Sequence, residues 1–360
     1  MKIAMLVPAL GERDAIGTDA LEMSAALGRM GHDVRLFAAV NTTGMAAASP
    51  DAIDAFVERN DDVLIYHFAF GWPPGVEILK RVRCRRVVRY HNVTPPEFFG
   101  GWSEEYENAC RAGREEIAVL AALGCELYLG ASPFNVDDFI EAGVSRERTA
   151  VLAPFNRLSR LIETPANLDL LNELSDETTT WLTVGRLAPN KGHLDLFDAF
   201  ATYLDRCDAR ARLLVIGSED ARLSRYNEAI REKIRSRRID AHVRFLRGVD
   251  DSVLKAAYLA ADALVSLSRH EGFCVPLAEA MALSTPVVAL DRGAQAWTLG
   301  GAGLLWSEPD PSLTAAAVER LRADGKLRSV LRDRGFARVA TTFAPDALEA
   351  QLATVLGAFR

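Results

Sequence analysis

The stretch from His270 to Leu290, HEGFCVPLAEAMALSTPVVAL, joins a loop, a helix start and a strand. Pro276 predicts that the helix begins there, because the amide hydrogen that proline lacks has no helical partner in the first turn. Glu271 lies on the loop before this helix, and Glu279 lies on its first turns. The backbone N–H groups of a helix start attract anions. We therefore expect a phosphate-bearing ligand here, with one carboxylate at each end of it.

Each carboxylate also has a simpler explanation. Glu279 can be a solvent-facing helix residue, and Glu271 can be an acid favoured near a helix start by the helix dipole. A ligand-binding site is favoured because Glu271 and Glu279 occur together with a pair of cations, Arg186 and Lys191.

The bulk composition is that of a globular protein. The 360 residues are 49% hydrophobic and 25% charged, which is enough to bury a large core and to form two domains. The net charge of −7 argues against a nucleic-acid binder that depends on phosphate attraction. The five cysteines are odd in number and widely spaced. They fit neither a disulfide framework nor a zinc site, and they favour a reducing compartment.

The sequence predicts no membrane span. The opening MKIAMLVPAL is followed at once by charged residues and is typical of a first strand. No apolar run approaches the roughly 18 residues that cross a bilayer. We expect a cytoplasmic protein, with any membrane contact peripheral and on the inner face. The basic run from Lys80 to Arg89 can meet an anionic lipid surface or acceptor, or it can be a solvated helix end and edge strand.

Apolar, β-branched runs alternate with helical patterns along the whole chain. The first half offers KIAMLV at Lys2, DVRLFAA at Asp33, DVLIYHF at Asp62, RRVVRYHN at Arg85, LYLGAS at Leu127 and TAVLAPF at Thr149. The second half offers TWLTVG at Thr180, ARLLVIG at Ala211, VRFLRG at Val243, ALVSLS at Ala263, PVVAL at Pro286 and GAGLLW at Gly301. Helices are expected over Thr18–Met30, stopped by Gly31, and over Glu104–Leu123. This alternation predicts parallel sheets covered by helices on both faces.

A mixed polar stretch over residues 156–180 interrupts the alternation and marks a domain boundary. The fold class is therefore α/β, with two doubly wound domains in tandem over residues 1–157 and 158–342. A separate terminal helix is expected within 343–360. In such folds ligands bind beyond the carboxyl ends of the strands or between domains.

Further candidates for binding stand at strand ends in the second half. Arg186 and Lys191 flank a turn after a strand and suit a diphosphate, unless they are solvated loop cations. The loop containing Arg247 and Val249 follows another strand and can hold a base against its backbone, although it can also be an ordinary turn.

The first half offers His91, which follows the strand RRVVRY, and the weaker candidate His67. A histidine is more often structural than catalytic, but the carboxyl end of a strand is where an α/β fold places ligands. Gly17 lies at the start of the first helix and can let a backbone amide approach a phosphate or sugar.

The segments VGRLAPNKG, LLVIG and FLRGVDDSVLKAAYLAADALVSLSRHEGFCVPLAEAMALSTPVVAL resemble the retaining glycosyltransferases of the two-Rossmann-domain type, family 4. The resemblance is strongest over residues 180–305 and is weaker in GHDVRLF, YHNVTP, SPFNVDDFIEAGV and VLAPFN. It implies the GT-B fold, two Rossmann-like domains facing across a cleft. The N-terminal domain would bind an acceptor and be completed by the helix of 343–360, and the C-terminal domain would bind a nucleotide-sugar donor.

The resemblance also implies roles for individual residues. Arg186 and Lys191 would hold the donor diphosphate in place of a metal, and Glu279 would bind the ribose hydroxyls. Glu271 would face the sugar and its phosphate, and His91 would reach the sugar from the opposite wall of the cleft. The residues around the helix start that would contact the donor with their backbone are Gly272, Phe273, Cys274 and Val275.

No metal or other cofactor is implied, and no Asp-X-Asp stands at a strand end. Members of the family retain the anomeric configuration through front-face attack, so we assign no protein nucleophile. The chain departs from the family pattern at AIGTDA, where the glycine-rich first loop is reduced, and at Phe155 and Asn156, where an Asn-Gly pair is usual. These departures concern the acceptor side.

The expected function is transfer of a hexose to a glycan or lipid-linked acceptor, with the form HEGFCVPLAEAM favouring mannose from GDP-mannose. The same chemistry with a UDP-sugar is the nearest alternative. A nucleotide-sugar epimerase is disfavoured by the set of Arg186, Lys191, Glu271 and Glu279. A third alternative, from another class, is a catalytically silent subunit that only binds the nucleotide-sugar.

Overall fold

The computed structural model describes residues 1–11 and 14–357. The chain divides into two compact units. Unit 1 comprises Met1–Pro96, Asn108–Arg157 and Thr342–Arg360, and unit 2 comprises Glu97–Glu107 and Leu158–Thr341. Residues 97–107, which we placed with the N-terminal domain, thus group with unit 2.

Within the described residues, unit 1 is built on a six-stranded parallel sheet in the order β2-β1-β3-β4-β5-β6. Its strands are β1 (Lys2–Leu10), β2 (Asp33–Asn41), β3 (Val63–Phe68), β4 (Arg85–Tyr90), β5 (Leu127–Gly130) and β6 (Thr149–Val151). Its helices are α1 (Ala15–Arg29), α2 (Ile53–Phe56), α3 (Pro73–Arg81), α4 (Glu104–Ala122, whose start belongs to unit 2), α5 (Pro133–Glu141) and α15 (Pro345–Gly357).

Unit 2 has its own six-stranded parallel sheet among the described residues, in the order β12-β11-β10-β7-β8-β9. Its strands are β7 (Thr180–Val184), β8 (Arg212–Ile216), β9 (Val243–Leu246), β10 (Ala263–Ser266), β11 (Val287–Leu290) and β12 (Leu304–Trp306). Its helices are α6 (Leu158–Glu163), α7 (Leu168–Leu174), α8 (His193–Arg206), α9 (Ser224–Arg237), α10 (Asp251–Ala260), α11 (Val275–Ala282), α12 (Gln295–Leu299), α13 (Pro311–Ala323) and α14 (Gly325–Arg338).

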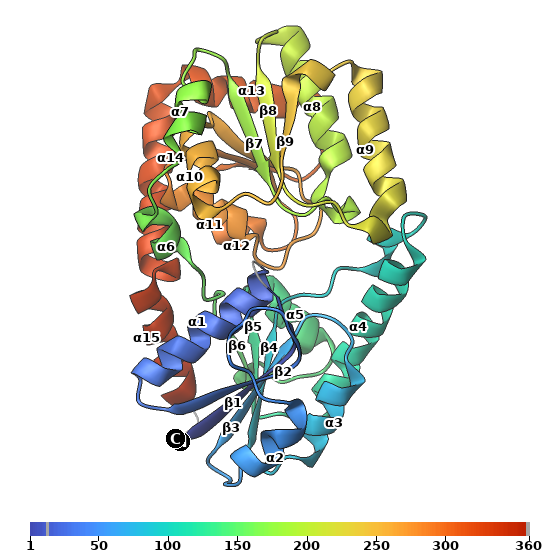
Figure 1. The fold of residues 1–360 in the computed structure, drawn as a ribbon, viewed down its shortest axis with the longest axis vertical. Helices are drawn as coiled ribbons and strands as arrows, with labels where there is room; N and C mark the ends of the chain where they lie inside the picture. The colour runs from blue at the N-terminus through green and yellow to red at the C-terminus, as the bar shows by residue number, and fades with distance from the viewer. Residues whose placement is uncertain (12–13, 358–360) are drawn as a thin grey trace. The chain divides into compact units, whose positions relative to one another are not determined.

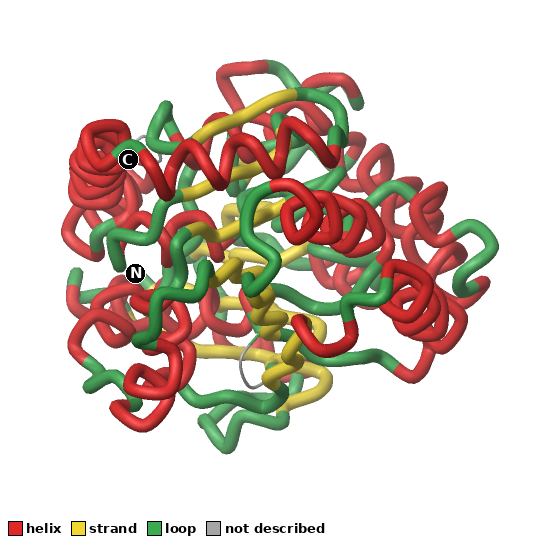
Figure 2. Tube along the Cα trace, turned by 90° about the horizontal axis from the view of Figure 1, so that it is seen from above, coloured by secondary structure: helices red, strands yellow, loops and turns green. Residues whose placement is uncertain are grey.

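Helices flank the strands of each unit in Figure 1, and Figure 2 shows helices around the strands in a second view. The predicted α/β class with two doubly wound sheets is confirmed, and each stretch expected to form a strand does so. The reason is burial on both faces, which selects continuous apolar runs in parallel strands. In β3, for example, every residue is buried.

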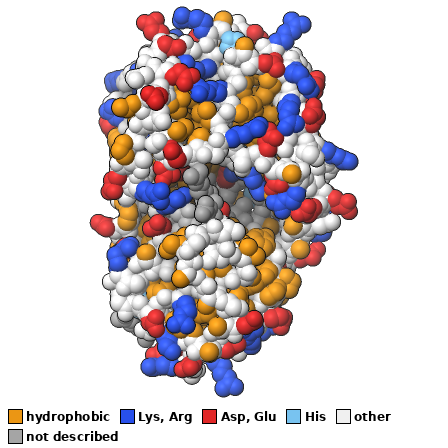
Figure 3. Space-filling view, viewed as in Figure 1, with side chains coloured by type: hydrophobic (Ala, Val, Ile, Leu, Met, Phe, Trp, Pro, Cys, Tyr) orange, Lys and Arg blue, Asp and Glu red, His pale blue; other side chains and the backbone are white. Residues whose placement is uncertain are grey.

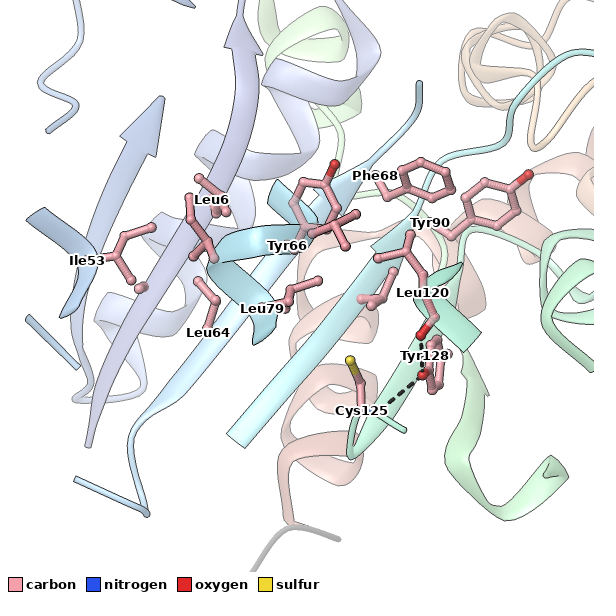
Figure 4. Packing of buried hydrophobic residues seen from close by; sticks show 14 of the residues in the cluster. Leu6, Ile53, Leu64, Tyr66, Phe68, Leu79, Tyr90, Leu120, Cys125 and Tyr128 are labelled. Atoms are coloured by element: carbon pink, nitrogen blue, oxygen red, sulfur yellow. Dashed lines mark hydrogen bonds between the residues drawn. The ribbon is translucent and has the colours of Figure 1, made fainter. Parts of the chain in front are cut away.

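The core of unit 1 packs aliphatic and aromatic side chains from the sheet against those of its helices (Figure 4). Tyr128 of β5 shows how a polar group is accommodated there. Its hydroxyl donates to the carbonyl of Leu120 at 2.8 Å and accepts from the amide of Cys125 at 3.0 Å. The phenol thus links the last turn of α4 to the residue two positions before β5, and it stabilises the turn between them.

The polar stretch over residues 156–180 contains two helices that the sequence analysis did not predict. In α6 the buried residues are Leu158 and Leu161, and in α7 they are Leu170 and Leu174. Leucines spaced three and four residues apart give each short helix one apolar side, which packs although the rest of the stretch is polar. The predicted terminal helix is present as α15, and residues 358–360 of that prediction lie outside the described residues.

The basic run from Lys80 to Arg89 does not form an edge strand, because β4 lies between β3 and β5. Its ion pairs are Lys80–Glu77, Arg81–Asp54, Arg86–Glu126 and Arg89–Asp19. Arg89 is fully buried, so it cannot contribute to a lipid-binding surface. Figure 3 shows cations and carboxylates intermingled over the visible face. No helix in the described part of the chain is both long enough and apolar enough to cross a bilayer.

Candidate functional site

The strand order of unit 2 changes direction between β7 and β10. The chain builds β7, β8 and β9 outward on one side, then returns to place β10 on the other side of β7. Loops that leave adjacent strands in opposite directions open a crevice at their carboxyl ends, which is where doubly wound folds bind ligands. Lys191 follows β7 and Glu271 follows β10, so both lie at this switch point.

The helix predicted to start at Pro276 is α11, which begins at Val275. Cys274 precedes it in the left-handed region, with φ 72°, and no side chain caps this helix start. A left-handed residue turns the chain sharply from the loop after β10 into the helix. Val275 and Pro276 are half-buried, whereas the candidate residues Gly272, Phe273 and Cys274 are buried.

Side chains of α12 hold this loop in place. Gln295 donates to the carbonyl of Ser268 at 2.8 Å, and Thr298 donates to the carbonyl of Phe273. Both side chains are fully buried. The sequence analysis missed them, because a Gln and a Thr in a short helix carry no signal that they contact a loop some 25 residues earlier.

The loops after β7 and β10 are joined by backbone contacts. The amide of Arg269 donates to the carbonyl of Asn190 at 2.8 Å, and the Asn190 side chain donates to the carbonyl of His270 at 3.3 Å. Gly192 adopts φ 69°, and a Cβ atom there would lie 2.0 Å from the carbonyl oxygen of Leu267. Only glycine allows this approach, which brings the neighbouring Lys191 to the loop of Glu271.

Lys191 and Glu271 form an ion pair with Nζ and Oε1 2.7 Å apart. The side chains are 25% and 9% exposed. Burial disfavours the ammonium form, but the Glu271 carboxylate outweighs it, so the pKa of Lys191 is raised above its usual value. The amine therefore stays charged, and an ammonium with three N–H groups keeps donors for a phosphate as well as for Glu271.

Glu279 lies on α11 and is half-buried. It accepts a hydrogen bond of 2.8 Å from the hydroxyl of Tyr258 on α10. Burial, together with the negative charge of Glu279, raises the pKa of Tyr258 well above its usual value, so the phenol remains a donor. The two carboxylates of the opening stretch are thus held by different partners, a lysine and a tyrosine.

Arg186 is exposed after β7, and it contacts a residue from the first half of the chain. Its Nη1 donates to the hydroxyl of Tyr106 at 2.9 Å. The same hydroxyl donates to Asp220 and accepts from Arg222 at 2.7 Å. Burial and the bond to Asp220 raise the pKa of Tyr106 to about 12. Sequence reasoning missed Tyr106, because nothing in residues 97–107 indicates that they pack on unit 2.

The remaining donor-side candidates lie further from Lys191 in the sheet. Arg247 and Val249 follow β9, which β8 separates from β7. Arg247 is exposed and paired with Glu219, and Val249 is half-buried.

Gly17 lies in the first turn of α1 in unit 1. Its amide donates to the carboxylate of the N-cap Asp14 at 2.6 Å. A Cβ atom at this position would lie 2.9 Å from the carbonyl oxygen of Gly11. The observed role of Gly17 is therefore to let the helix start pack closely on the preceding loop.

His91 follows β4 at the carboxyl edge of the unit 1 sheet, as predicted, and it belongs to a buried cluster. Its Nε2 lies 3.0 Å from Nδ1 of His67 on β3. Asp19 of α1 lies beside both rings, 3.5 Å from His91 Nε2 and 3.7 Å from His67 Nδ1. Burial lowers the pKa of His67 to about 4 and that of His91 well below its usual value, so both rings are neutral near pH 7.

Asp19 and Arg89 complete this cluster, and the sequence analysis missed both roles. Arg89 Nε donates to Asp19 Oδ2 at 2.9 Å, and Arg89 Nη2 donates to Asp19 Oδ1 at 3.2 Å. Although burial favours the neutral acid, the guanidinium lowers the pKa of Asp19. The ligand atoms of Asp19, His67 and His91 lie within 4.8 Å of one another, a spacing that could hold a metal ion. In this arrangement, however, Arg89 already supplies the cation for the carboxylate.

Comparison with known proteins relates this geometry to a family. Residues 172–338 match the family model described as "Glycosyl transferases group 1". Mannosylfructose-phosphate synthase of Agrobacterium fabrum is 31% identical over 260 residues, covering 66% of this chain and 56% of the synthase. D-inositol 3-phosphate glycosyltransferase of Jonesia denitrificans is 31% identical over 177 residues, covering 48% of this chain and 41% of that enzyme. The chain thus spans about half the length of the curated relatives it matches.

The fold has close counterparts among solved structures. Anabaena HepE in complex with UDP-glucose has a TM-score of 0.78 and 18% sequence identity, covering 99% of this chain and 100% of that one. At this level of identity the likeness concerns the fold. The chain has the GT-B fold, with two α/β units that are each built on a parallel sheet, and its residues 172–338 match the group 1 glycosyl transferase model.

Proposed function

We propose that this protein is a retaining glycosyltransferase that transfers a hexose from a nucleotide-sugar donor to a glycan or lipid-linked acceptor. The observation that carries the proposal is the partly buried Lys191–Glu271 pair at the β7–β10 switch point, inside the region that matches the family model. A fixed ammonium in a place of low solvent access stabilises the negative charge that develops on a departing diphosphate.

The donor-side roles follow the positions of the residues. Lys191 and Arg186 hold the diphosphate, the first as a partly buried point charge and the second as an exposed planar guanidinium. Glu279, oriented by Tyr258, accepts hydrogen bonds from the ribose hydroxyls. Glu271 and the backbone of residues 272–274 face the sugar and its phosphate. His91 contacts the transferred sugar.

The transfer itself needs no protein nucleophile. The bond between the anomeric carbon and the β-phosphate oxygen breaks, and the acceptor oxygen bonds to the same face of that carbon. The acceptor proton passes to the departing phosphate oxygen. Lys191 and Arg186 supply the positive charge for the leaving group, so the reaction proceeds without a metal ion.

Two donors have support. The name of the Agrobacterium relative contains a mannosyl group, which agrees with GDP-mannose as our preferred donor. The Anabaena structure holds UDP-glucose, which favours the alternative of a UDP-sugar with the same chemistry.

A thermal-shift panel of GDP, UDP, ADP and TDP tests the proposal, because a ligand at 100 times its Kd stabilises the folded state by about 2.7 kcal/mol. We expect GDP to raise the midpoint most and EDTA to leave both the shift and transfer unchanged. A response to UDP alone would replace GDP with UDP in the proposal. No response to any of the four would refute donor binding, and a response without turnover for any acceptor would favour the catalytically silent subunit.

A further inference from the structure

The close contact between His67 and His91 depends on which ring nitrogen of each histidine carries the proton. The two imidazoles stack, with ring centroids 5.2 Å apart and planes at 19°. The 3.0 Å contact between His67 Nδ1 and His91 Nε2 needs one donor and one acceptor. Since both rings are neutral, only two arrangements of the protons satisfy it.

The first arrangement places a proton on His67 Nδ1, which donates to a bare His91 Nε2. The other nitrogen of His67 is then an acceptor without a partner. The second arrangement reverses the bond and places a proton on His67 Nε2. That atom is buried and has no hydrogen-bond partner among the described residues. A buried N–H group without an acceptor is rarer in proteins than an acceptor without a donor, so the first arrangement is favoured.

The carboxylate beside the two rings does not reverse this choice. Asp19 Oδ1 accepts from Arg89 and from the amide of Phe155 at 2.6 Å, and Oδ2 accepts from Arg89. Asp19 Oδ2 is further from the imidazole nitrogens than they are from each other. The charge of the Asp19 carboxylate is thus neutralised by Arg89. The shortest contact of the two imidazoles is the one between His67 Nδ1 and His91 Nε2.

The backbone of His91 is fixed to the same strand as its imidazole. Its amide donates to the carbonyl of Phe68 at 2.9 Å, next to His67 on β3. The following residue, Asn92, adopts φ 85°. A non-glycine residue in the left-handed region is strained, and it keeps this conformation only where surrounding contacts hold it there. The backbone amide of His91 and its ring Nε2 are therefore both held by β3.

We propose that His67 is a positioning residue, which holds His91 in the tautomer that carries its proton on Nδ1. His91 then presents Nδ1–H as a hydrogen-bond donor. Neither imidazole acts as the general base that deprotonates the hydroxyl of the glycan or lipid-linked substrate. The use of this donor on the transferred sugar rests on the proposed function, whereas the tautomer itself does not.

The tautomer can be read directly by long-range ¹H–¹⁵N correlation NMR on the full chain labelled with ¹⁵N-histidine. His91 and His67 are assigned from the signals lost in His91→Gln and His67→Asn. We expect a protonated Nδ1 and a bare Nε2 for His91 in the wild type. A protonated Nε2 on His91 in the wild type would overturn the proposal.

Two substitutions test whether His67 sets the tautomer. His67→Leu removes the donor and leaves the Asp19 carboxylate as the nearest partner, so the His91 proton should move to Nε2. His67→Asn keeps an N–H group near the position of Nδ1 and should retain the wild-type pattern. His242→Asn is the matched control, since that imidazole contacts the carbonyl of Ala211 in unit 2, and it should leave the His91 signals unchanged. An unchanged His91 tautomer in His67→Leu would show that His67 does not set it.

Transfer kinetics in the same variants test whether the His91 Nδ1–H group acts on the transferred sugar. His67→Leu should lower kcat about 100-fold, the scale on which loss of one aimed donor acts, while the thermal shift with nucleoside diphosphate stays at the wild-type value. His67→Asn should restore most of the rate. A shifted tautomer with an unchanged kcat would refute the donor role of His91. A wild type that neither binds nucleotide nor transfers sugar would refute the proposed function, and the NMR result would still decide the tautomer.

Discussion

Lys191 and Glu271 illustrate how a charged group is kept in a largely buried place. Each would be costly to bury alone, and the 2.7 Å contact makes the pair tolerable. In a purely structural ion pair, this mutual neutralisation would be the whole role of the two residues. This pair lies at the carboxyl ends of two adjacent parallel strands, next to a helix start without a side-chain cap, which is a position suited to an anionic ligand.

Lys191→Ala should lower kcat by at least about 100-fold, because it removes a fixed cation from the leaving group. Steady-state transfer assays measure the effect. Lys233→Ala is the matched control, since Lys233 pairs with Asp198 at 2.8 Å and is 26% exposed, much like Lys191. The control should stay within about twofold of wild type. Equal losses in the two variants would show that Lys191 is only a structural cation.

His193 is a buried histidine whose protonation should affect stability. Burial, and then the charge of Lys191, lower its pKa from 6.5 to about 4. Below pH 6.5 the unfolded chain takes up a proton that the folded chain refuses, so stability falls as the pH decreases from 6.5 toward 4. The slope from this residue approaches about 1.4 kcal/mol per pH unit.

His193→Asn should remove this contribution. Urea unfolding of both proteins at several pH values measures it, and other titrating groups cancel in the difference. The difference in unfolding free energy should be constant above pH 7 and change in favour of the variant between pH 6.5 and 4. Parallel curves throughout would mean that His193 is protonated equally in both states.

At the scale of elements, the loop between β7 and α8 decides where Lys191 lies. Gly192 ends this loop and also caps α8, and its backbone passes against the carbonyl of Leu267 at the end of β10. Two loops that leave adjacent strands can approach this closely only where one of them lacks a side chain. The site is therefore a property of the pair of loops and not of either one.

Gly192→Ala should cost more than a left-handed alanine alone, because the new methyl overlaps a backbone atom that cannot move away easily. We expect a loss of about 3 kcal/mol or more from strain and overlap together, with weaker nucleotide binding. Gly301→Ala is the comparison, since Gly301 also has a positive φ, 83°, but among the described residues no heavy atom beyond its chain neighbours lies within 4 Å of the added methyl. It should lose only about 1–2 kcal/mol. Urea unfolding compares the two, and equal losses would contradict the packing argument.

At the scale of the whole molecule, the two units are not simply two halves of the sequence. Unit 1 takes its last helix, α15, from the end of the chain, and unit 2 takes residues 97–107 from the first half. Leu348, Leu352 and Leu356 of α15 are buried, and Arg29 of α1 pairs with Glu349. The C-terminal helix thus buries its leucines within unit 1 and is joined to α1 by an ion pair.

Leu352→Ala should lower the free energy of unfolding by about 2–5 kcal/mol, because it leaves a cavity at a fully buried position. Leu168→Ala, at a leucine that is 70% exposed, should change it by no more than about 0.5 kcal/mol. Chemical denaturation measures both. If the two substitutions had the same effect, α15 would not contribute to the core of unit 1.

Much of this fold is predictable because its signals are local. Apolar runs become strands of three to nine residues, Pro276 lies in the first turn of α11, and Gly31 follows the end of α1 with φ 85°. The helices α6 and α7 escaped prediction because their apolar sides are only two leucines each. Arg89 was misjudged because a cation beside other cations looks solvated until its partner is known.

The sequence by itself determined the alternation of strands and helices and the start of α11, since both follow from local periodicity and backbone chemistry. It also supplied the candidate residues of the proposed donor site. Only the tertiary structure decided which of these residues meet. Lys191 and Glu271 are 80 positions apart, as are Arg186 and Tyr106, and Asp19 and Arg89 are 70 apart. Such contacts depend on strand order and on loops crossing at the sheet edge, and no local pattern encodes either.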